Sequence, residues 1–160
     1  MRPIAIGLLV VCLGLIGLTG YLYFTANVII TDIECIATDA ADQKETFDWL
    51  KTQTEEGTFV GTPFHTGDLG EAGEYQFLTY TARISNGSFL KAEVAEMQVT
   101  PMSGDVLQMA AEGLKSIPAR RGGSVSATIL TRKGGHNVRE LVLTYYLWGL
   151  PFSERVTYSK

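Results

Sequence analysis

The feature that most constrains this chain is an uncharged run of 21 residues near its N-terminus, from Ile4 to Phe24. In a helix that rises about 1.5 Å per residue, such a run spans roughly 31 Å, the thickness of a bilayer's hydrocarbon core. A cleaved signal peptide usually has an apolar run of about 7 to 15 residues and then a small-residue cleavage site. Here the best such site, Phe24-Thr25-Ala26, begins with a bulky side chain. Residues 1–27 therefore predict an uncleaved transmembrane anchor, with late signal cleavage as the open alternative.

Basic residues flank this anchor on one side only. Arg2 precedes it, whereas the first basic residue after it is Lys44. Cytoplasmic flanks of membrane helices carry an excess of Lys and Arg, and aromatic residues such as Tyr23 and Phe24 favour the membrane interface. We therefore expect a single-pass protein of the cell membrane with its N-terminus in the cytoplasm and residues 28–160 as an extracytoplasmic domain.

Cysteine usage agrees with one domain that lacks disulfides. Cys12 lies in the anchor and Cys35 is alone in the outer domain, so no bridge forms within that domain. We expect Cys35 to behave as a small apolar residue on a strand. A domain without disulfides fits a bacterial surface better than an animal secreted protein.

The outer domain is dominated by short segments with a period of two. In the clearest, residues 78–85, apolar Leu78, Tyr80, Ala82 and Ile84 alternate with more polar residues, as in a half-buried strand. An amphipathic helix is expected up to Glu55, with Asp39 as its N-cap. About seven short strands and one early helix predict a mainly β fold, an antiparallel immunoglobulin-like β-sandwich, with an open barrel as the alternative. The strands are expected at about 28–38, 78–85, 95–100, 105–109, 125–130, 141–148 and 152–158, with at most a short one at 58–62.

Part of the chain resembles a known group of proteins. The strand Tyr80-Thr81-Ala82-Arg83-Ile84-Ser85 ends in Asn86-Gly87, and Ile117-Pro118 and Gly122-Gly123 precede the strand at 124–130. Over residues 75–131 this resembles small bacterial membrane-anchored proteins with one immunoglobulin-like outer domain, of the FxLYD and CARDB-like types. The aromatic-rich motif that names the FxLYD group is missing. Those families are adhesive or uncharacterised, so the resemblance implies binding rather than catalysis and transfers no site residues.

No motif in the sequence points to an enzyme. There is no G-x-S-x-G elbow, no P-loop and no dinucleotide fingerprint. His65 with Asp68, Glu71 and Glu74 forms the best cluster of metal ligands, but its spacing is not that of an EF-hand. We therefore expect no catalytic residue, no cofactor and no resident metal, and leave calcium binding by the loop at 65–74 open.

Charge is distributed unevenly along the outer domain. Residues 28–75 hold 11 acids and 2 bases, whereas residues 76–160 hold 6 acids and 10 bases. The net negative charge makes nucleic acid an improbable partner. Between two of the predicted strands lies a basic hairpin tip, which we expect to be solvated or to meet anionic lipid or wall polymer. The tip contains Arg132, Lys133, His136 and Arg139.

Aromatic residues gather in the last third of the chain, at Tyr145, Tyr146, Trp148, Phe152 and Tyr158. Adjacent strand residues point to opposite faces, so either Tyr145 or Tyr146 leaves the core. Together with the basic tip, Tyr146 and Trp148 are the predicted interaction surface. The expected function is a non-enzymatic module that binds a protein partner near the membrane. The alternatives are binding of carbohydrate or cell-wall polymer, and a structural envelope protein.

Overall fold

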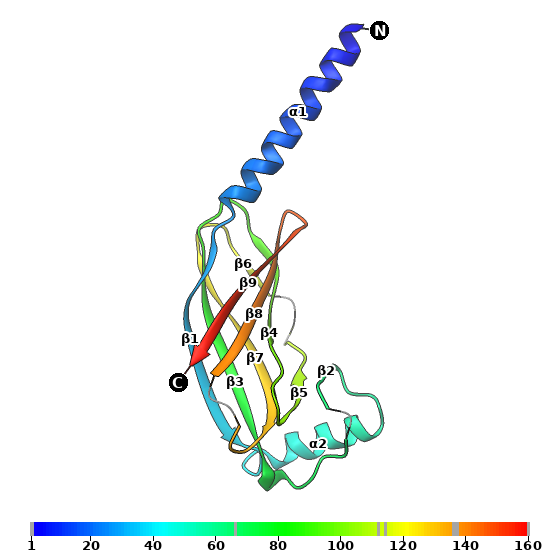
Figure 1. Ribbon diagram of the computed structural model, residues 1–160, viewed down its shortest axis with the longest axis vertical. Coiled ribbons are helices and arrows are strands. Elements are labelled where there is room, and N and C mark those ends of the chain that lie inside the picture. The colour runs from blue at the N-terminus through cyan, green and yellow to red at the C-terminus, as the bar shows by residue number, and fades with distance from the viewer. Residues whose placement is uncertain (1, 66, 112, 114, 136–137, 160) are drawn as a thin grey trace.

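The computed structural model of this chain describes residues 2–65, 67–111, 113, 115–135 and 138–159. A long helix, α1 (Arg2–Thr25), projects from one end of an elongated β domain (Figure 1). Its stretch Pro3–Thr25 is long and apolar enough to cross a membrane, and none of the most apolar part is buried against the rest of the molecule. An N-terminal signal sequence would meet the same criteria, so α1 is an apolar helix of membrane-anchor or signal type.

Two antiparallel sheets form the domain. The first, sheet A, has the strand order β1-β3-β7-β5-β2, and the second, sheet B, has the order β6-β4-β8-β9. The predicted mainly β, antiparallel sandwich is confirmed, with nine strands over the described residues instead of about seven. Sheet A contains β1 (Val28–Asp39), β2 (Gly61–Pro63), β3 (Tyr75–Asn86), β5 (Asp105–Met109) and β7 (Gly122–Arg132). Sheet B contains β4 (Ala92–Val99), β6 (Lys115–Ile117), β8 (Val138–Leu147) and β9 (Leu150–Ser159).

The main core lies between the two sheets. The alternation predicted for β3 is confirmed, because Tyr80, Ala82 and Ile84 are buried and pack with residues of sheet B such as Leu141 and Leu143. Inward and outward residues alternate along both sheets, so burial of one face explains the period of two in the sequence.

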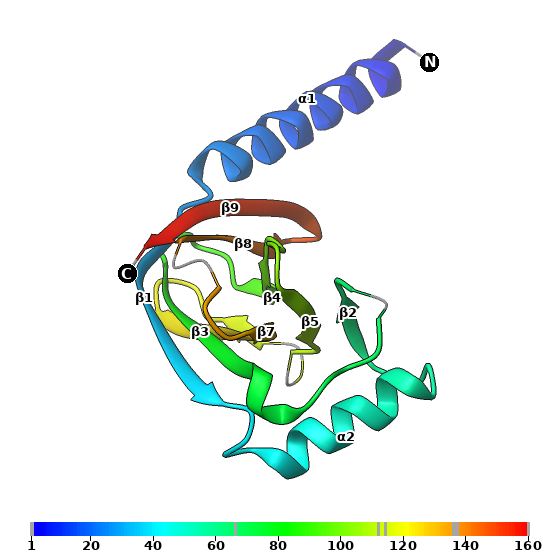
Figure 2. The same cartoon turned by 60° about the horizontal axis from the view of Figure 1, so that its bottom comes forward.

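A second, smaller core covers the outer face of sheet A at the end remote from α1. Here α2 (Lys44–Glu55) packs Phe47 and Leu50 against β3, with the rings of Phe47 and Tyr75 5.5 Å apart (Figure 2). Phe77 belongs to this core, whereas its neighbour Leu78 belongs to the main core. Sheet A is therefore buried on both faces here, which requires consecutive apolar residues rather than alternating ones. A single turn of 3-10 helix, η1 (Ala72–Glu74), leads into β3.

Two local predictions are wrong. Asp39 does not cap a helix: it ends β1, where it pairs with Gln76, and α2 begins only at Lys44. The ladder with β3 continues through this residue, so tertiary pairing overrides its capping preference. The second difference lies before the strand predicted at 125–130: no strand is expected there, whereas Lys115–Ile117 form β6 and the turn is limited to residues 118–121.

We name the two ends of the domain by their position relative to α1. The anchor end consists of loop 87–91 and turns 118–121 and 148–149. It is joined to the connection that follows the helix by a hydrogen bond from the Gly87 amide to the carbonyl of Asn27, at 2.7 Å. The distal end consists of α2, segment 64–74, and turns 102–104 and 132–135 (Figure 1).

Candidate functional site

The residues predicted to form an interaction surface lie at opposite ends of the domain. They lie on β8 or next to its two ends, and this strand has 10 residues and therefore spans roughly 30 Å. Tyr146 and Trp148 lie at its anchor end, whereas Arg132 and Lys133 belong to the distal turn before it. His136 lies outside the described residues. The structure therefore does not bring the predicted residues into one surface.

The aromatic residues at the anchor end divide as the strand pattern predicts. Tyr145 is buried and its ring stacks on Phe152 at 5.6 Å, whereas Tyr146 is 36% and Trp148 62% exposed. Trp148 occupies the tight turn between β8 and β9, where its backbone φ is +51°. This turn places the indole at the tip of the hairpin, outside the core.

Arg139 corrects the prediction most clearly, because it does not lie on the surface. Its guanidinium donates two hydrogen bonds to the carboxylate of Asp105, at 2.7 and 2.8 Å, and both side chains are fully buried. Arg139 is in phase with Leu141 on β8, and so points into the sandwich toward sheet A. The amide of Met102 donates a further hydrogen bond to Asp105 at 2.7 Å. The pair joins the two sheets beneath the distal end and is unavailable to an external ligand.

Tyr80 lies close to this ion pair inside the main core. Burial, with a smaller contribution from the nearby Cys35, raises the pKa of Tyr80 to about 12, although the charge of Arg139 acts to lower it. Cys35 is half-buried and packs against the core, which is close to the environment predicted for a small apolar residue on a strand. A phenol with so high a pKa stays protonated at neutral pH.

A cleft of about 560 Å³ opens at the distal end, within the size range of ligand pockets. Backbone hydrogen bonds hold its walls: the amides of Phe64 and His65 both donate to the carbonyl of Val106, at 2.8 and 3.0 Å. The amide of Arg132 donates to Gly104 at 2.9 Å, and that of Lys133 to Glu74 at 3.0 Å. The cleft is therefore already formed by three segments fixed to a rigid sandwich.

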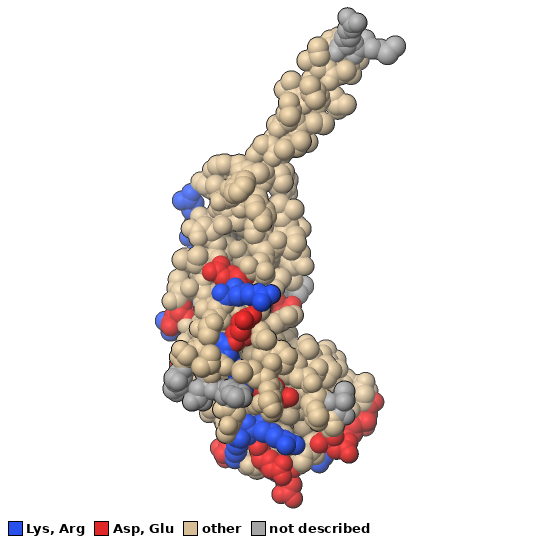
Figure 3. Space-filling view, viewed as in Figure 1, with Lys and Arg blue, Asp and Glu red and all other residues tan. Residues whose placement is uncertain are grey.

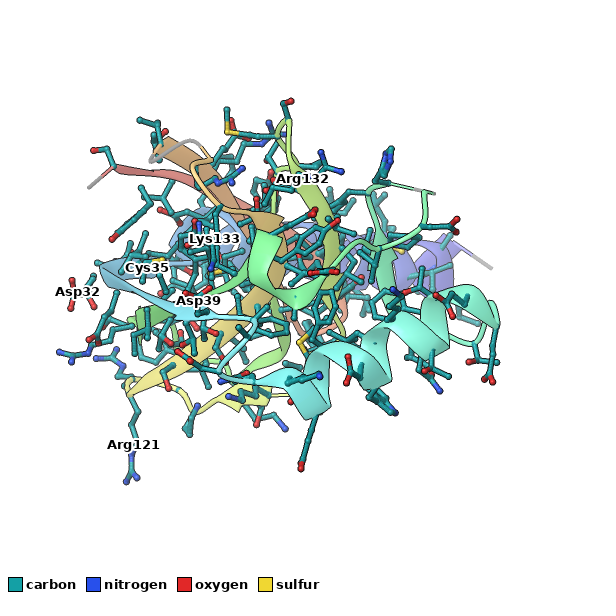
Figure 4. All side chains as sticks on the ribbon, turned by 90° about the horizontal axis from the view of Figure 1, so that it is seen from below. Asp32, Cys35, Asp39, Arg121, Arg132 and Lys133 are labelled. Carbon is teal, nitrogen blue, oxygen red and sulfur yellow. The ribbon has the colours of Figure 1, made fainter. Side chains whose placement is uncertain are left out.

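Charged groups of both signs surround this cleft. Asp68, Arg132 and Lys133 line it, and Lys133 forms an ion pair with Asp39 (Figure 4). Arg132 is exposed and makes no ion pair with any of the described residues. Its guanidinium is thus accessible to an anionic group at the rim of the cleft.

The proposed calcium ligands do not converge. Within the described part of the chain, no group of three His, Cys, Asp or Glu side chains is placed to hold a metal ion. The carboxylate of Glu74 instead lies against Gly70, and the ring of His65 against Gly67.

Several exposed residues at the two ends were not singled out from the sequence. Trp49 lies on α2 and is 52% exposed, although Phe47 and Leu50 on the same helix are buried. At the anchor end, Phe89 is 62% exposed and the guanidinium of Arg120 lies 4.0 Å from its ring centre. Trp49 and Phe89 each come directly before a leucine that is buried or half-buried. Adjacent residues point in different directions, so an aromatic residue next to an inward-pointing leucine is expected on the surface. That position is the signal in the sequence that could have identified both aromatic residues.

Comparisons with known proteins do not assign the chain to a family. No family model and no curated protein matches the sequence. Solved structures share part of the fold at low similarity. The GAE domain of yeast GGA1 is 14% identical over 57% of this chain and 96% of that one, with a TM-score of 0.40. A FixG-related protein from Vibrio parahaemolyticus is 12% identical over 56% and 82% of the two chains, with a TM-score of 0.34. The cupredoxin domain of amoB from Nitrosocaldus yellowstonii is 14% identical over 82% and 85%, with a TM-score of 0.35.

Proposed function

We propose that this chain is a non-enzymatic, single-pass membrane protein whose outer domain binds a protein partner through the distal cleft. Its N-terminus lies in the cytoplasm and its β-sandwich lies outside the cell membrane, as in the bacterial proteins that residues 75–131 resemble. The single observation that carries the proposal is a preformed cleft at the end of the domain farthest from α1. A site in that position is accessible to a partner while the chain is anchored.

The lining of the cleft favours a polypeptide as the ligand. Four glycines contribute to its walls, Gly67, Gly104, Gly134 and Gly135, so backbone groups are accessible to a ligand that approaches closely. Phe64 and Leu69 offer apolar contacts beside them. An extended segment with mixed polar and apolar side chains matches such a surface.

Arg132 gives the partner a more definite chemistry. Its neighbour Lys133 is paired with Asp39, so Arg132 is the base at this rim with a guanidinium available for bidentate contact. We infer that the partner's segment carries an Asp, a Glu or a terminal carboxylate at that point. The many acids of α2 and segment 64–74 repel other parts of an acidic partner and so limit which segment binds.

The test is cross-linking and co-purification of the tagged full-length chain from its own membrane. The control keeps α1 and replaces residues 28–160 by an unrelated domain. We expect a stoichiometric partner with the native chain, its loss in the control, and its loss with Arg132→Glu. The matched variant Arg83→Glu changes an exposed arginine of the outer face of sheet A and should retain the partner.

Two outcomes would overturn the proposal. If no protein is captured, binding of a protein partner is wrong, and titration with cell-wall polymer tests the alternative ligand. If Arg132→Glu retains the partner while Trp148→Ala loses it, the partner binds at the anchor end instead of the distal cleft.

A further inference from the structure

We propose that the anchor end of the domain docks onto the surface of the bilayer that α1 crosses, with anionic phospholipid headgroups as its ligand. The inference rests on the proposed function, in which α1 is an uncleaved anchor. It adds a second contact with the membrane, made by the β domain itself through Phe89, Trp148 and the bases beside them.

The height of Trp148 relative to α1 is the first observation. Tyr23, in the last two turns of α1, contacts Phe152 with ring centres 5.3 Å apart. The turn that carries Trp148 lies about two strand residues, roughly 7 Å, beyond Phe152 toward the anchor end. The indole therefore reaches at least the level of the last aromatic turns of the helix. Tryptophan and tyrosine both favour the interface between bilayer and water.

The shortness of the connection is the second observation. Only Ala26 and Asn27 separate the end of α1 from the start of β1, and two residues reach at most about 7 Å. The hydrogen bond between Gly87 and Asn27 fixes loop 87–91 to this connection. A Cβ on Gly87 would lie 3.2 Å from the Asn27 carbonyl oxygen, so this close approach favours glycine. The anchor end thus cannot leave the neighbourhood of the membrane while α1 is inserted.

Charge is the third observation. The three segments of the anchor end contain Lys91, Arg120 and Arg121 and no acidic residue, although Lys91 pairs with the nearby Glu93 at 3.1 Å. Residues 39–74, at the other end, contain nine acids and two bases. In Figure 3, acidic side chains gather toward the distal end and are missing from the visible face next to α1. An anionic membrane surface attracts the first end and repels the second.

A rigid frame holds these side chains in place. Asn86 is buried, and its amide nitrogen lies 2.8 to 3.2 Å from the carbonyl oxygens of Leu90, Ile117 and Pro118, which it can donate to. Its side-chain oxygen accepts hydrogen bonds from Ser88. Loop 87–91 is therefore fastened to turn 118–121, so the stacked pair of Phe89 and Arg120 is presented as a unit. Such a preformed surface loses little conformational entropy when it meets the headgroups.

These observations favour lipid over a protein at this end. The exposed aromatic and basic residues surround the base of α1, where the headgroup layer lies when the helix is inserted. A protein partner would have to enter the gap left by a connection of two residues. Docking also fixes the orientation of the sandwich relative to the bilayer, with the distal cleft directed away from the membrane.

The two tryptophans of the chain allow a direct test, because one lies at each end. The full-length chain is reconstituted in vesicles of phosphatidylcholine with phosphatidylglycerol, whose acyl chains carry bromine near the headgroup. Trp49→Phe leaves only Trp148, and Trp148→Phe leaves only Trp49 as the internal control. We expect brominated lipid to remove most of the Trp148 fluorescence and to shift its emission to shorter wavelength, whereas Trp49 stays unquenched.

The basic residues are tested by a triple variant in the Trp49→Phe background, with Lys91, Arg120 and Arg121 each changed to Gln. We expect its quenching in anionic vesicles to fall to the level seen in pure phosphatidylcholine. A matched triple variant, with Lys44, Arg83 and Arg155 changed to Gln, removes the same charge elsewhere and should be quenched like the parent chain. Equal quenching in both triple variants would contradict the anionic headgroup as the ligand.

Flotation of the vesicles and extraction with carbonate separate the two proposals. A chain that carbonate removes from the membrane contradicts the anchor, and the docking with it. A chain that stays in the membrane with Trp148 quenched no more than Trp49 contradicts the docking alone. If the Trp148 emission shifts only in native membranes and not in lipid vesicles, a protein covers this end and the docking is wrong.

Discussion

The two ends of the domain are built from different interactions. At the anchor end, an uncharged side chain, Asn86, ties two segments together, and the large exposed side chains are aromatic or basic. At the distal end, a buried ion pair between Asp105 and Arg139 joins the sheets beneath an open cleft, and a second core supports the walls. The difference fits the two ligands that we propose, phospholipid headgroups at the anchor end and a protein partner at the distal end.

The largest expected effect concerns the distal end. Arg139→Ala leaves the carboxylate of Asp105 buried without its cation, and loss of one member of a buried pair typically costs about 3–5 kcal/mol. Chemical denaturation of the full-length chain in detergent should show this decrease in the free energy of unfolding. The double variant Arg139→Met with Asp105→Leu should recover most of it. If Arg139→Ala alone is neutral, the ion pair does not hold the distal end together.

The next effect concerns the anchor end. Asn86→Ala removes the side-chain donor from the buried carbonyl group of Ile117, and an unsatisfied buried group costs about 1–3 kcal/mol. We expect a loss of about 2–3 kcal/mol in the same denaturation experiment, together with faster hydrogen exchange in loop 87–91. The distal cleft should be unchanged, so co-purification of the partner should persist. Equal loosening of both ends would contradict their independence.

A smaller effect depends on pH and on Tyr80. Its pKa is raised from 10.0 when unfolded to about 12 in the fold, so the native state favours the protonated phenol. The stabilisation is fully present below pH 10 and is lost as the pH rises through 12, with about 2 kcal/mol gone near pH 11.5. Burial also raises the pKa of Tyr145, nearer the anchor end, with the charge of Glu154 adding to it.

Absorbance titration of the tyrosines and denaturation at several pH values measure this effect. Tyr80→Phe should remove the phenol that titrates last and flatten the fall in stability between pH 10 and 12. The matched variant Tyr21→Phe changes an exposed residue of α1 and should leave the fall in place. A titration in which every tyrosine ionises near pH 10 would contradict the buried environment of Tyr80.

The smallest effect on stability is expected for the two exposed tryptophans. Trp49→Ala and Trp148→Ala should each change the free energy of unfolding by no more than about 0.5 kcal/mol, as is usual for exposed positions. Their effects on binding should differ, because only Trp148 lies on the surface proposed to meet lipid. A large loss of stability with Trp148→Ala would assign the indole a packing role instead.

The sequence predicted the class of the fold because burial of one sheet face imposes a period of two, as in Tyr80, Ala82 and Ile84. It did not reveal the second core, because the consecutive apolar pair Phe77-Leu78 reads like the end of one strand until α2 is placed over it. β6 was missed because its three residues are too short to show a pattern.

For the candidate site, local chemistry was more predictable than location. The opposite orientation of Tyr145 and Tyr146 followed from strand geometry. The burial of Arg139 also had a signal, because Arg139 lies two residues before Leu141 and therefore on the same face of β8. Its charge nevertheless predicted exposure, since the sequence does not show that Asp105 lies opposite it. The distal cleft had no such signal, because its walls come from segments far apart in the sequence that only the sheet order brings together.

Photo-crosslinking in the native membrane tests most directly whether the two ends have different ligands. A photoreactive phenylalanine analogue replaces either Asp68, which lines the distal cleft beside an intact Arg132, or Trp148 in the full-length chain, and the adducts are identified by mass spectrometry. Position 148 should react with phospholipid, and position 68 should react with one protein. A single protein adduct at position 148, with lipid or no adduct at position 68, would contradict the assignment of the two ends.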